Sequence, residues 1–210
     1  MSTTTTQNTE QLIDGIANDG YAIIENFLPP EKIEILASEA KTLQEIGAMR
    51  RAGTGKNAAS LPDGSLRGDF IHWLEQDSIS AVQQEYLQHM ENLREHLNRS
   101  FYLGLFDLES HFAIYPPGAT YRKHLDQFQG FTQRQVSCTL YLNQDWRQTD
   151  GGQLRLYLDG ISPEPYVDIA PTGGTLVAFL SGRFWHEVLP AKHERMSLTG
   201  WFRTRSNEVI

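Results

Sequence analysis

A histidine and an aspartate lie two residues apart in YRKHLD, residues 121–126. The segment reads as a β-strand, in which side chains two residues apart point to the same face, so His124 and Asp126 can bind one metal ion. His186 supplies a third ligand from another expected strand, 60 residues after Asp126. Two imidazoles and one carboxylate leave three open positions, a donor set typical of non-haem iron(II), whereas structural zinc takes four protein ligands. The spacing therefore predicts a mononuclear iron site.

Arg195 follows His186 by nine residues, at the start of the last expected strand. An arginine directed into a barrel is costly unless it is paired with an anion, and a guanidinium holds a carboxylate through two parallel bonds. We expect Arg195 to bind the distal carboxylate of 2-oxoglutarate, with Thr199 on the same face of the strand. The alternative for Arg195 is a salt bridge at the rim with Glu194 or Glu187. Its coincidence with the metal ligands favours the cosubstrate.

Eight short apolar or alternating segments follow residue 101, separated by Gly, Pro and Asp. They span residues 111–115, 121–126, 135–142, 153–158, 166–169, 174–180, 184–189 and 195–204. Strands at such spacing are typical of a sandwich or barrel. We predict an α+β, mainly β fold, in which a double-stranded β-helix (jelly roll) occupies residues 101–210.

The supporting helices are expected in residues 11–100. After a flexible polar tail at residues 1–10, residues 11–18 read as a short helix and residues 20–27 as a buried strand. Pro29 and Pro30 begin a second helix. Residues 78–100 carry apolar side chains at steps of three and four, the helical period. These helices should pack against the outside of the β unit.

Residues 48–68 are rich in Gly, Ser, Asn and basic side chains and are predicted to form a mobile loop. A loop of this length inside a compact domain is uncommon unless it is a lid or disordered. We favour a lid over the site, and a surface insertion is the alternative.

Composition narrows the function classes. With 210 residues and 40% hydrophobic content, residues 11–210 are expected to form one domain. The 18 basic and 26 acidic side chains give a net charge of −8, which offers no general attraction to nucleic acid or to an anionic membrane. Cys138 is the only cysteine, which excludes an intrachain disulfide and a thiol-rich metal site. No apolar run of about 18 residues and no signal pattern occur, so a cytoplasmic protein is expected. We also expect a monomer.

Several motifs in this order and spacing resemble the prolyl hydroxylases of the hypoxia-inducible-factor type and their bacterial relatives. They are YPPG at 115–118, HLD at 124–126, LYLNQDW at 140–146, GGQLRL at 151–156, HEV at 186–188 and RMSLTGW at 195–201. The resemblance implies iron(II), 2-oxoglutarate and oxygen, with ascorbate as a reductant. It also implies that Tyr141 donates its hydroxyl to the carboxylate held by Arg195. Tyr115 would line the cosubstrate pocket, a role that Tyr121 can also take, and Thr199 and Trp201 would form its walls. From the residues alone, a core role for Tyr141 stays open.

The segment RGDFIHW, residues 67–73, resembles the family's segment that leads out of the mobile loop. The resemblance implies that Arg67, Asp69 and Trp73 frame the substrate groove. Arg134 matches a basic residue that pairs with the aspartate.

The resemblance further implies that a prolyl residue of a protein is hydroxylated to 4-hydroxyproline with release of succinate and carbon dioxide. Elongation factor Tu is the first candidate for that protein. One alternative is an oxygenase acting on free proline or another small molecule. Another is a non-catalytic cupin-like binding or sensing module, which would not need Arg195 and Tyr141 together.

Overall fold

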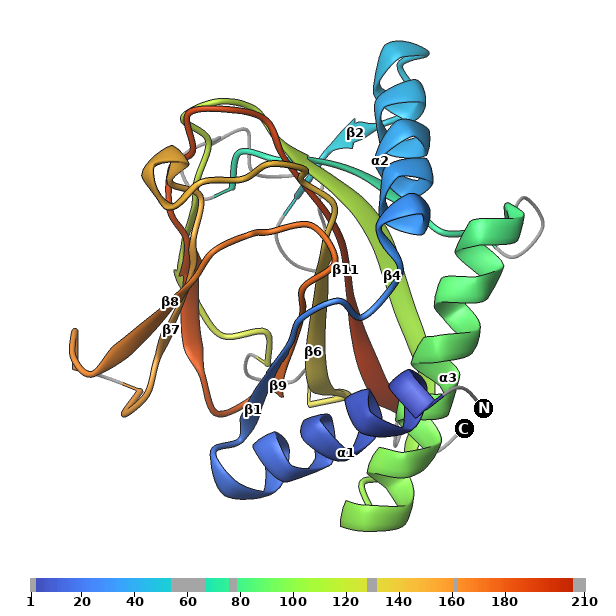
Figure 1. Ribbon diagram of the computed structural model, residues 1–210. Coiled ribbons are helices and arrows are strands. Elements are labelled where there is room, and N and C mark those ends of the chain that lie inside the picture. Colours follow the sequence, from blue (N-terminus) through green and yellow to red (C-terminus); the bar gives the residue numbers. More distant parts are fainter. Residues whose placement is uncertain (1–2, 54–66, 76–78, 128–131, 161, 206–210) are drawn as a thin grey trace, which may run out of the picture.

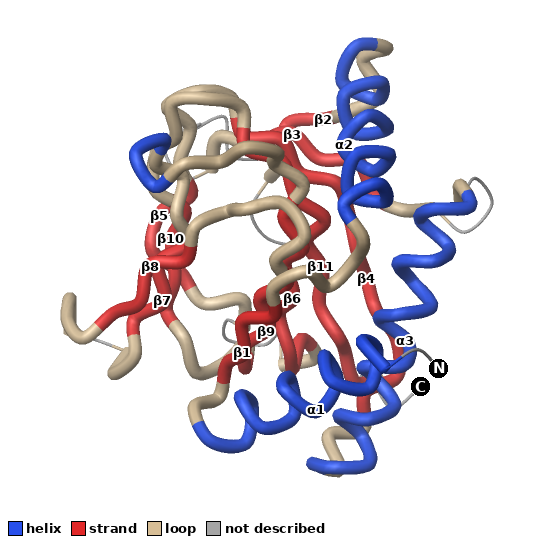
Figure 2. Tube along the Cα trace, viewed as in Figure 1, coloured by secondary structure: helices blue, strands red, loops and turns tan. Residues whose placement is uncertain are grey.

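Two antiparallel β-sheets pack against each other, and the α-helices cover the outer face of the larger sheet (Figure 1). The computed structural model describes residues 3–53, 67–75, 79–127, 132–160 and 162–205. Figure 2 shows the long α-helices gathered on one side of the strands, as expected for supporting elements.

The larger sheet has seven strands in the described part of the chain. In spatial order they are β1 (Tyr21–Ile24), β9 (Leu176–Leu180), β6 (Arg134–Tyr141), β11 (Arg195–Thr204), β4 (Leu105–Tyr115), β3 (Phe70–Trp73) and β2 (Arg50–Arg51). The smaller sheet has the order β5 (Tyr121–His124), β10 (Trp185–Val188), β7 (Leu154–Tyr157) and β8 (Tyr166–Ile169). From β4 onward the chain passes back and forth between the sheets, with β7 and β8 as neighbours in the smaller one. This arrangement confirms the predicted jelly roll and its eight strands.

Three α-helices support the larger sheet: α1 (Thr3–Asn18), α2 (Pro30–Glu45) and α3 (Ala81–Phe101). A 3-10 turn, η2, spans Gln148–Asp150. Helix α3 begins where the Ser80 side chain accepts a hydrogen bond from the Gln83 amide at 3.2 Å, and it ends at Tyr102 in the left-handed region. Its buried stripe follows the helical period: Val82, Tyr86, Met90, Leu93 and Leu97.

The apolar side chains form two cores. One lies between the helices and the larger sheet, and it includes Leu36, Leu93 and Leu198. The other lies between the sheets around Tyr141 and Phe179. Successive residues of β11 divide between these cores, because side chains along a strand alternate faces. Arg195 and its neighbours at even spacing therefore point between the sheets, where the predicted site lies.

We expect Leu93→Ala to lower the free energy of unfolding by about 2–5 kcal/mol, because it leaves a cavity at a fully packed position of α3. The melting temperature, followed by circular dichroism, should fall by roughly 5–15 °C. Glu95→Ala, two residues further along α3 and exposed, is the matched control and should change the stability by less than about 0.5 kcal/mol. An equal shift in both variants would show that α3 is not anchored by this stripe.

Some boundaries differ from those expected. Helix α1 begins at Thr3, inside the predicted tail, because the stripe of Leu12 and Ile16 extends back to the buried Thr9. Within the predicted mobile loop, Arg50–Arg51 instead forms the edge strand β2 on β3. Residues 54–66 of that loop lie outside the described residues, and the predicted lid with them. Strand β4 begins at Leu105 because it pairs with β11 along nearly its whole length.

Candidate active site

His124, Asp126 and His186 come together where β5 and β10 pair. The register places His186 directly opposite His124, and Asp126 follows the end of β5. His124 Nε2 lies 3.6 Å from Asp126 Oδ1, and His186 Nε2 lies 3.6 Å from Asp126 Oδ2. One donor atom from each residue lies within 4.8 Å of the others. The predicted cluster is therefore assembled with a geometry that can hold one ion.

Neighbouring groups orient all three side chains. His124 Nδ1 lies 2.7 Å from the Arg122 carbonyl, and His186 Nδ1 lies 3.1 Å from the Phe184 carbonyl. Each Nδ1–H donating to its carbonyl leaves Nε2 free to bind metal. Ser137 donates its hydroxyl to Asp126 Oδ2 at 2.6 Å.

The electrostatics favour the metal-binding protonation states. Burial lowers the pKa of His186 to about 4, helped by the adjacent His124, so its imidazole is neutral at neutral pH. Burial opposes ionisation of Asp126, but His186, His124 and the Ser137 hydroxyl hold the pKa of its carboxyl well below its usual range. A neutral imidazole and an ionised carboxylate are the forms that bind iron(II).

Arg195 is buried in the same cavity as the three clustered residues. Its Nε donates to the Gly152 carbonyl at 2.8 Å, and its Cζ lies 4.9 Å from the ring centroid of Tyr141 and 5.2 Å from that of Tyr115. Among the described residues no carboxylate lies within ion-pair distance of Arg195. The alternative of a rim salt bridge is not seen: the Glu194 carboxylate accepts from Gln44 and the Glu187 carboxylate from Tyr157.

Tyr141 supplies a second polar group beside Arg195. Its hydroxyl is fully buried and makes no hydrogen bond of ordinary geometry within the described ranges. Burial raises the pKa of this phenol, and the positive charge of Arg195 partly offsets the rise. A buried guanidinium without an anion and a hydroxyl without a partner are both costly, and a carboxylate bound between them would satisfy both. The cavity thus has the donors that the distal end of a dicarboxylate needs.

Comparisons with known proteins agree with this chemistry. A family profile, the 2OG-Fe(II) oxygenase superfamily, matches residues 110–203. A crystal structure of a Pseudomonas putida prolyl-4-hydroxylase is 42% identical, with a TM-score of 0.83 over 94% of this chain and 100% of that one. The chain belongs to the 2OG-Fe(II) oxygenase superfamily. Enzymes of this family use iron(II), 2-oxoglutarate and oxygen.

Two further relatives of this oxygenase are animal proteins. A Trichoplax adhaerens prolyl hydroxylase, solved in complex with a peptide of a hypoxia-inducible factor oxygen degradation domain, is 27% identical. Its TM-score is 0.84 over 95% of this chain and 90% of that one. Human Egl nine homolog 1 is 30% identical in an alignment of 203 residues that covers 92% of this chain and 46% of the human protein. The chain thus spans about half the length of that curated relative.

Ser137 gives a test of how the oxygenase holds its metal. Removing the hydroxyl in Ser137→Ala frees one oxygen of the Asp126 carboxylate to rotate, so iron(II) affinity should fall by about 10- to 100-fold. Anaerobic titration with iron, followed by isothermal calorimetry, measures this. Ser38→Ala, on the exposed face of α2, is the matched control and should bind iron like the wild type. Unchanged affinity in Ser137→Ala would mean that this hydroxyl does not hold the carboxylate in place.

Aromatic and basic side chains also line the cavity that holds His124, Asp126 and His186. Tyr121 stacks on His124 with ring centroids 3.6 Å apart, and Arg67 Cζ lies 4.8 Å from the centroid of the Tyr121 ring. Thr199 Oγ1 lies 3.1 Å from Ser197 Oγ, and Trp201 also lines the cavity. Tyr115 and Tyr121 both line the cavity, so both tyrosines that the sequence offered for the cosubstrate pocket lie in the site.

The pairing of Arg134 with Asp69, implied by resemblance, is wrong in this structure. Asp69 is fully buried and accepts both of its bonds from Arg67, at 2.6 and 2.8 Å. Arg134 instead donates to Glu109 at 2.7 Å and lies over the Trp201 ring at 3.5 Å. The physical reason is the register, which sets Glu109 beside Trp201 on the neighbouring strand. Asp69 pairs with Arg67 because only one glycine separates the two residues in the sequence.

His111 is a wall residue that the sequence analysis did not single out. It lies on β4 two and four residues before Ala113 and Tyr115, which line the same cavity. Alternation along the strand gives that signal, because Tyr115 was already a candidate. The Trp73 ring packs against His111 with centroids 4.7 Å apart, which places this groove candidate beside the cavity.

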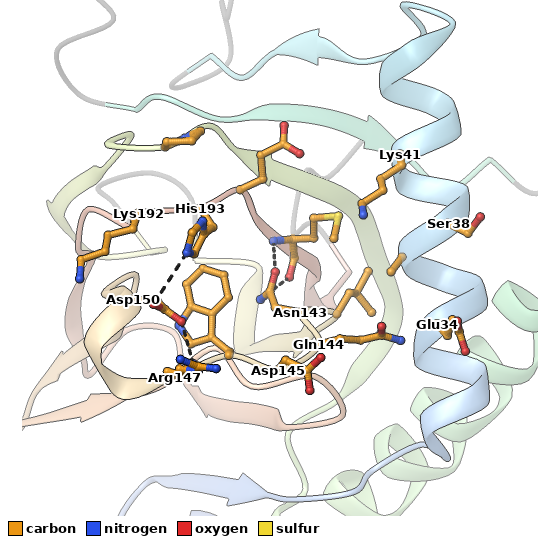
Figure 3. Close-up of a pocket in the computed structure, with 16 residues that line it drawn as sticks. Glu34, Ser38, Lys41, Asn143, Gln144, Asp145, Arg147, Asp150, Lys192 and His193 are labelled. Atoms are coloured by element: carbon orange, nitrogen blue, oxygen red, sulfur yellow. Dashed lines mark hydrogen bonds and ion pairs between the residues drawn. The ribbon is translucent and has the colours of Figure 1, made fainter.

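A larger and more open cavity of about 800 Å³ lies elsewhere, between α2 and the loops around residues 142–150 and 192–194 (Figure 3). Lys41 approaches it from α2, and His193 and Asp150 face each other across its other side at 3.8 Å. None of the candidate metal ligands lines this larger cavity. None of its lining residues has a buried polar side-chain atom that lacks a partner among the described residues. Of these two cavities, the smaller one is therefore the candidate active site.

None of the described helices is both long and apolar enough to cross a membrane.

Proposed function

We propose that this oxygenase hydroxylates a prolyl residue of a polypeptide, forming 4-hydroxyproline and converting 2-oxoglutarate to succinate and carbon dioxide. The observation that carries the proposal is Arg195, which is buried without an anionic partner, lines the same cavity as His124, Asp126 and His186, and lies next to the unpartnered hydroxyl of Tyr141. Identity of 42% with a prolyl-4-hydroxylase over that protein's whole length supports the choice of proline. We assign residues 11–210 to one oxygenase domain.

His124, Asp126 and His186 bind the iron in this proposal. Iron, 2-oxoglutarate and oxygen together supply a two-electron oxidant that places one oxygen atom in a C–H bond. Burial keeps the His186 imidazole neutral, and the contacts of Nδ1 with backbone carbonyls orient both imidazoles. Ser137 keeps the Asp126 carboxylate in one orientation. Three positions on the metal thus remain for small molecules rather than for protein.

Arg195 and Tyr141 hold the distal carboxylate of the cosubstrate. The guanidinium is fixed by its bond to the Gly152 carbonyl and by two flanking tyrosine rings, so it is preorganised rather than mobile. Thr199 adds a hydroxyl on the same face of β11, and Tyr115 and Trp201 complete the wall. The low dielectric of the buried site strengthens these charge-assisted bonds.

Arg67, Asp69, Trp73 and Arg134 position the substrate polypeptide. The bond to Asp69 holds the Arg67 side chain in the cavity wall, where it also contacts Tyr121. The Trichoplax relative was solved with a peptide, which supports a polypeptide substrate over free proline. We take elongation factor Tu as the first candidate substrate, which would place the reaction in the cytoplasm.

The proposal is tested with anaerobically purified, iron-loaded protein supplied with 2-oxoglutarate, ascorbate and oxygen. Succinate is measured with and without purified elongation factor Tu, and His124→Ala serves as the blank. Stimulation by elongation factor Tu, with a mass gain of one oxygen atom on a proline, supports the full proposal. Succinate without stimulation keeps the oxygenase and rejects that substrate, and free proline is then the next compound to test. No succinate above the blank favours a non-catalytic binding module.

A further inference from the structure

His111 is a buried histidine whose two ring nitrogens both lack a hydrogen-bond partner in the described part of the chain. The residue is 1% exposed and lines the cavity of the metal cluster. Buried polar side chains are nearly always hydrogen-bonded, and each one left unpaired costs about 1–3 kcal/mol. Two unpaired nitrogens on one ring, inside a binding cavity, point to a partner that a bound molecule brings.

Packing holds the imidazole in place. Trp73 lies opposite His111 on β3, and Thr199 lies opposite it on β11. The ring centroids of His111 and Trp73 are 4.7 Å apart, and those of His111 and Trp201 are 5.5 Å apart with a 30° angle between the planes. A ring held between two indoles presents its nitrogens in a fixed direction, which is what a positioning residue requires.

Burial and nearby positive charges keep the His111 ring neutral. Burial lowers the pKa of His111 well below its usual value, and the positive charges of Arg67 and Arg134 lower it further. A neutral imidazole has one N–H donor and one acceptor nitrogen. The indole Nε1–H of Trp201 is another buried donor without a partner within the described ranges, in the same cavity. The wall thus offers two donors and one acceptor.

We propose that His111 is a substrate-positioning residue that, with the Trp201 indole, binds backbone carbonyl oxygens flanking the target proline. This inference rests on the proposed function and specifies how the polypeptide is recognised. A prolyl residue has a carbonyl acceptor but no N–H, so the segment around it offers more acceptors than donors. This excess of acceptors matches the two donors of the wall, the N–H groups of the His111 ring and the Trp201 indole. The single acceptor nitrogen of His111 suits the N–H of the residue after the proline.

Two substitutions separate hydrogen bonding from ring packing. His111→Gln keeps a donor and an acceptor without the ring, and His111→Phe keeps the ring without the nitrogens. The probes are two pools of capped pentapeptides with random flanks, one with proline and one with alanine at the centre. Binding to the full chain is measured under nitrogen with iron and 2-oxoglutarate, so that no turnover occurs. His193→Phe, at an exposed histidine, is the matched control.

The wild type should retain the proline pool over the alanine pool. His111→Phe should bind the proline pool about 5- to 150-fold more weakly, the effect of two lost neutral hydrogen bonds. His111→Gln should stay within about threefold of the wild type. Equal binding by His111→Phe and the wild type overturns the inference, as does a wild type that binds neither pool or shows no preference for proline.

A measurement on the wild type guards against a variant that fails to fold. With ¹⁵N-labelled histidine, the His111 ring nitrogens should report a neutral ring and shift when the proline pool is added. Ring signals that stay unchanged on binding contradict a hydrogen bond. Succinate formed by the wild type above the His124→Ala blank, with the proline pool, with elongation factor Tu or with neither, reports the oxygenase separately. Its absence would remove the proposed function, whereas its presence with unaffected His111→Phe binding would remove only this inference.

Discussion

His186→Ala is expected to abolish succinate formation, with a loss of more than about 100-fold in both iron affinity and turnover. The physical reason is that the site has only three protein ligands in our proposal, so losing one leaves two donors and no fixed geometry. His186 is also the more buried of the two candidate histidine ligands, and burial keeps its imidazole neutral and able to bind a metal. The measurements are anaerobic iron titration and succinate formation by iron-saturated protein.

His193→Ala is the matched control, because His193 is a largely exposed histidine seven residues along the chain. It should bind iron and form succinate like the wild type. If the iron affinity of His186→Ala stays within a factor of two of the wild type, His186 is not a metal ligand. Circular dichroism of both variants shows whether the β-sheets are retained.

Arg195→Met is expected to raise the KM for 2-oxoglutarate by at least about 30-fold, because losing one partner of a buried charge pair costs about 2–5 kcal/mol. Methionine fills a similar volume without charge, so the protein without cosubstrate should keep nearly its wild-type melting temperature. 2-Oxoglutarate should raise the melting temperature of the iron-loaded wild type but not of the variant.

A second compound shows which end of the cosubstrate Arg195 binds. 2-Oxobutyrate has the 2-oxo acid group but no distal carboxylate, so the wild type should prefer 2-oxoglutarate strongly and Arg195→Met should lose most of that preference. Arg155→Met is the control, because Arg155 pairs with Asp168 on the smaller sheet and does not line the cavity. A variant that keeps the wild-type preference would assign the distal carboxylate to another residue.

The larger elements follow from local patterns. The period of the apolar residues predicted α3, and alternation between turn residues predicted all eight strands from β4 to β11. Both patterns depend on neighbours within a few positions, which is why a single sequence reveals them. The same alternation placed Arg195 and Thr199 on the cavity face of β11. By contrast, β2 is an edge strand of two basic residues and β3, next to it, has only four residues, so neither is long enough for an apolar period to mark it.

The sequence by itself determined the chemistry of this protein, because metal-ligand types at strand spacing and one arginine in a strand are properties of the residues. The tertiary structure alone decided the partners: Arg134 with Glu109, Asp69 with Arg67, and His111 with none among the described residues. Ion pairs and hydrogen bonds depend on distances of a few ångströms between strands. Sheet register sets those distances, and register is fixed by packing of the whole fold.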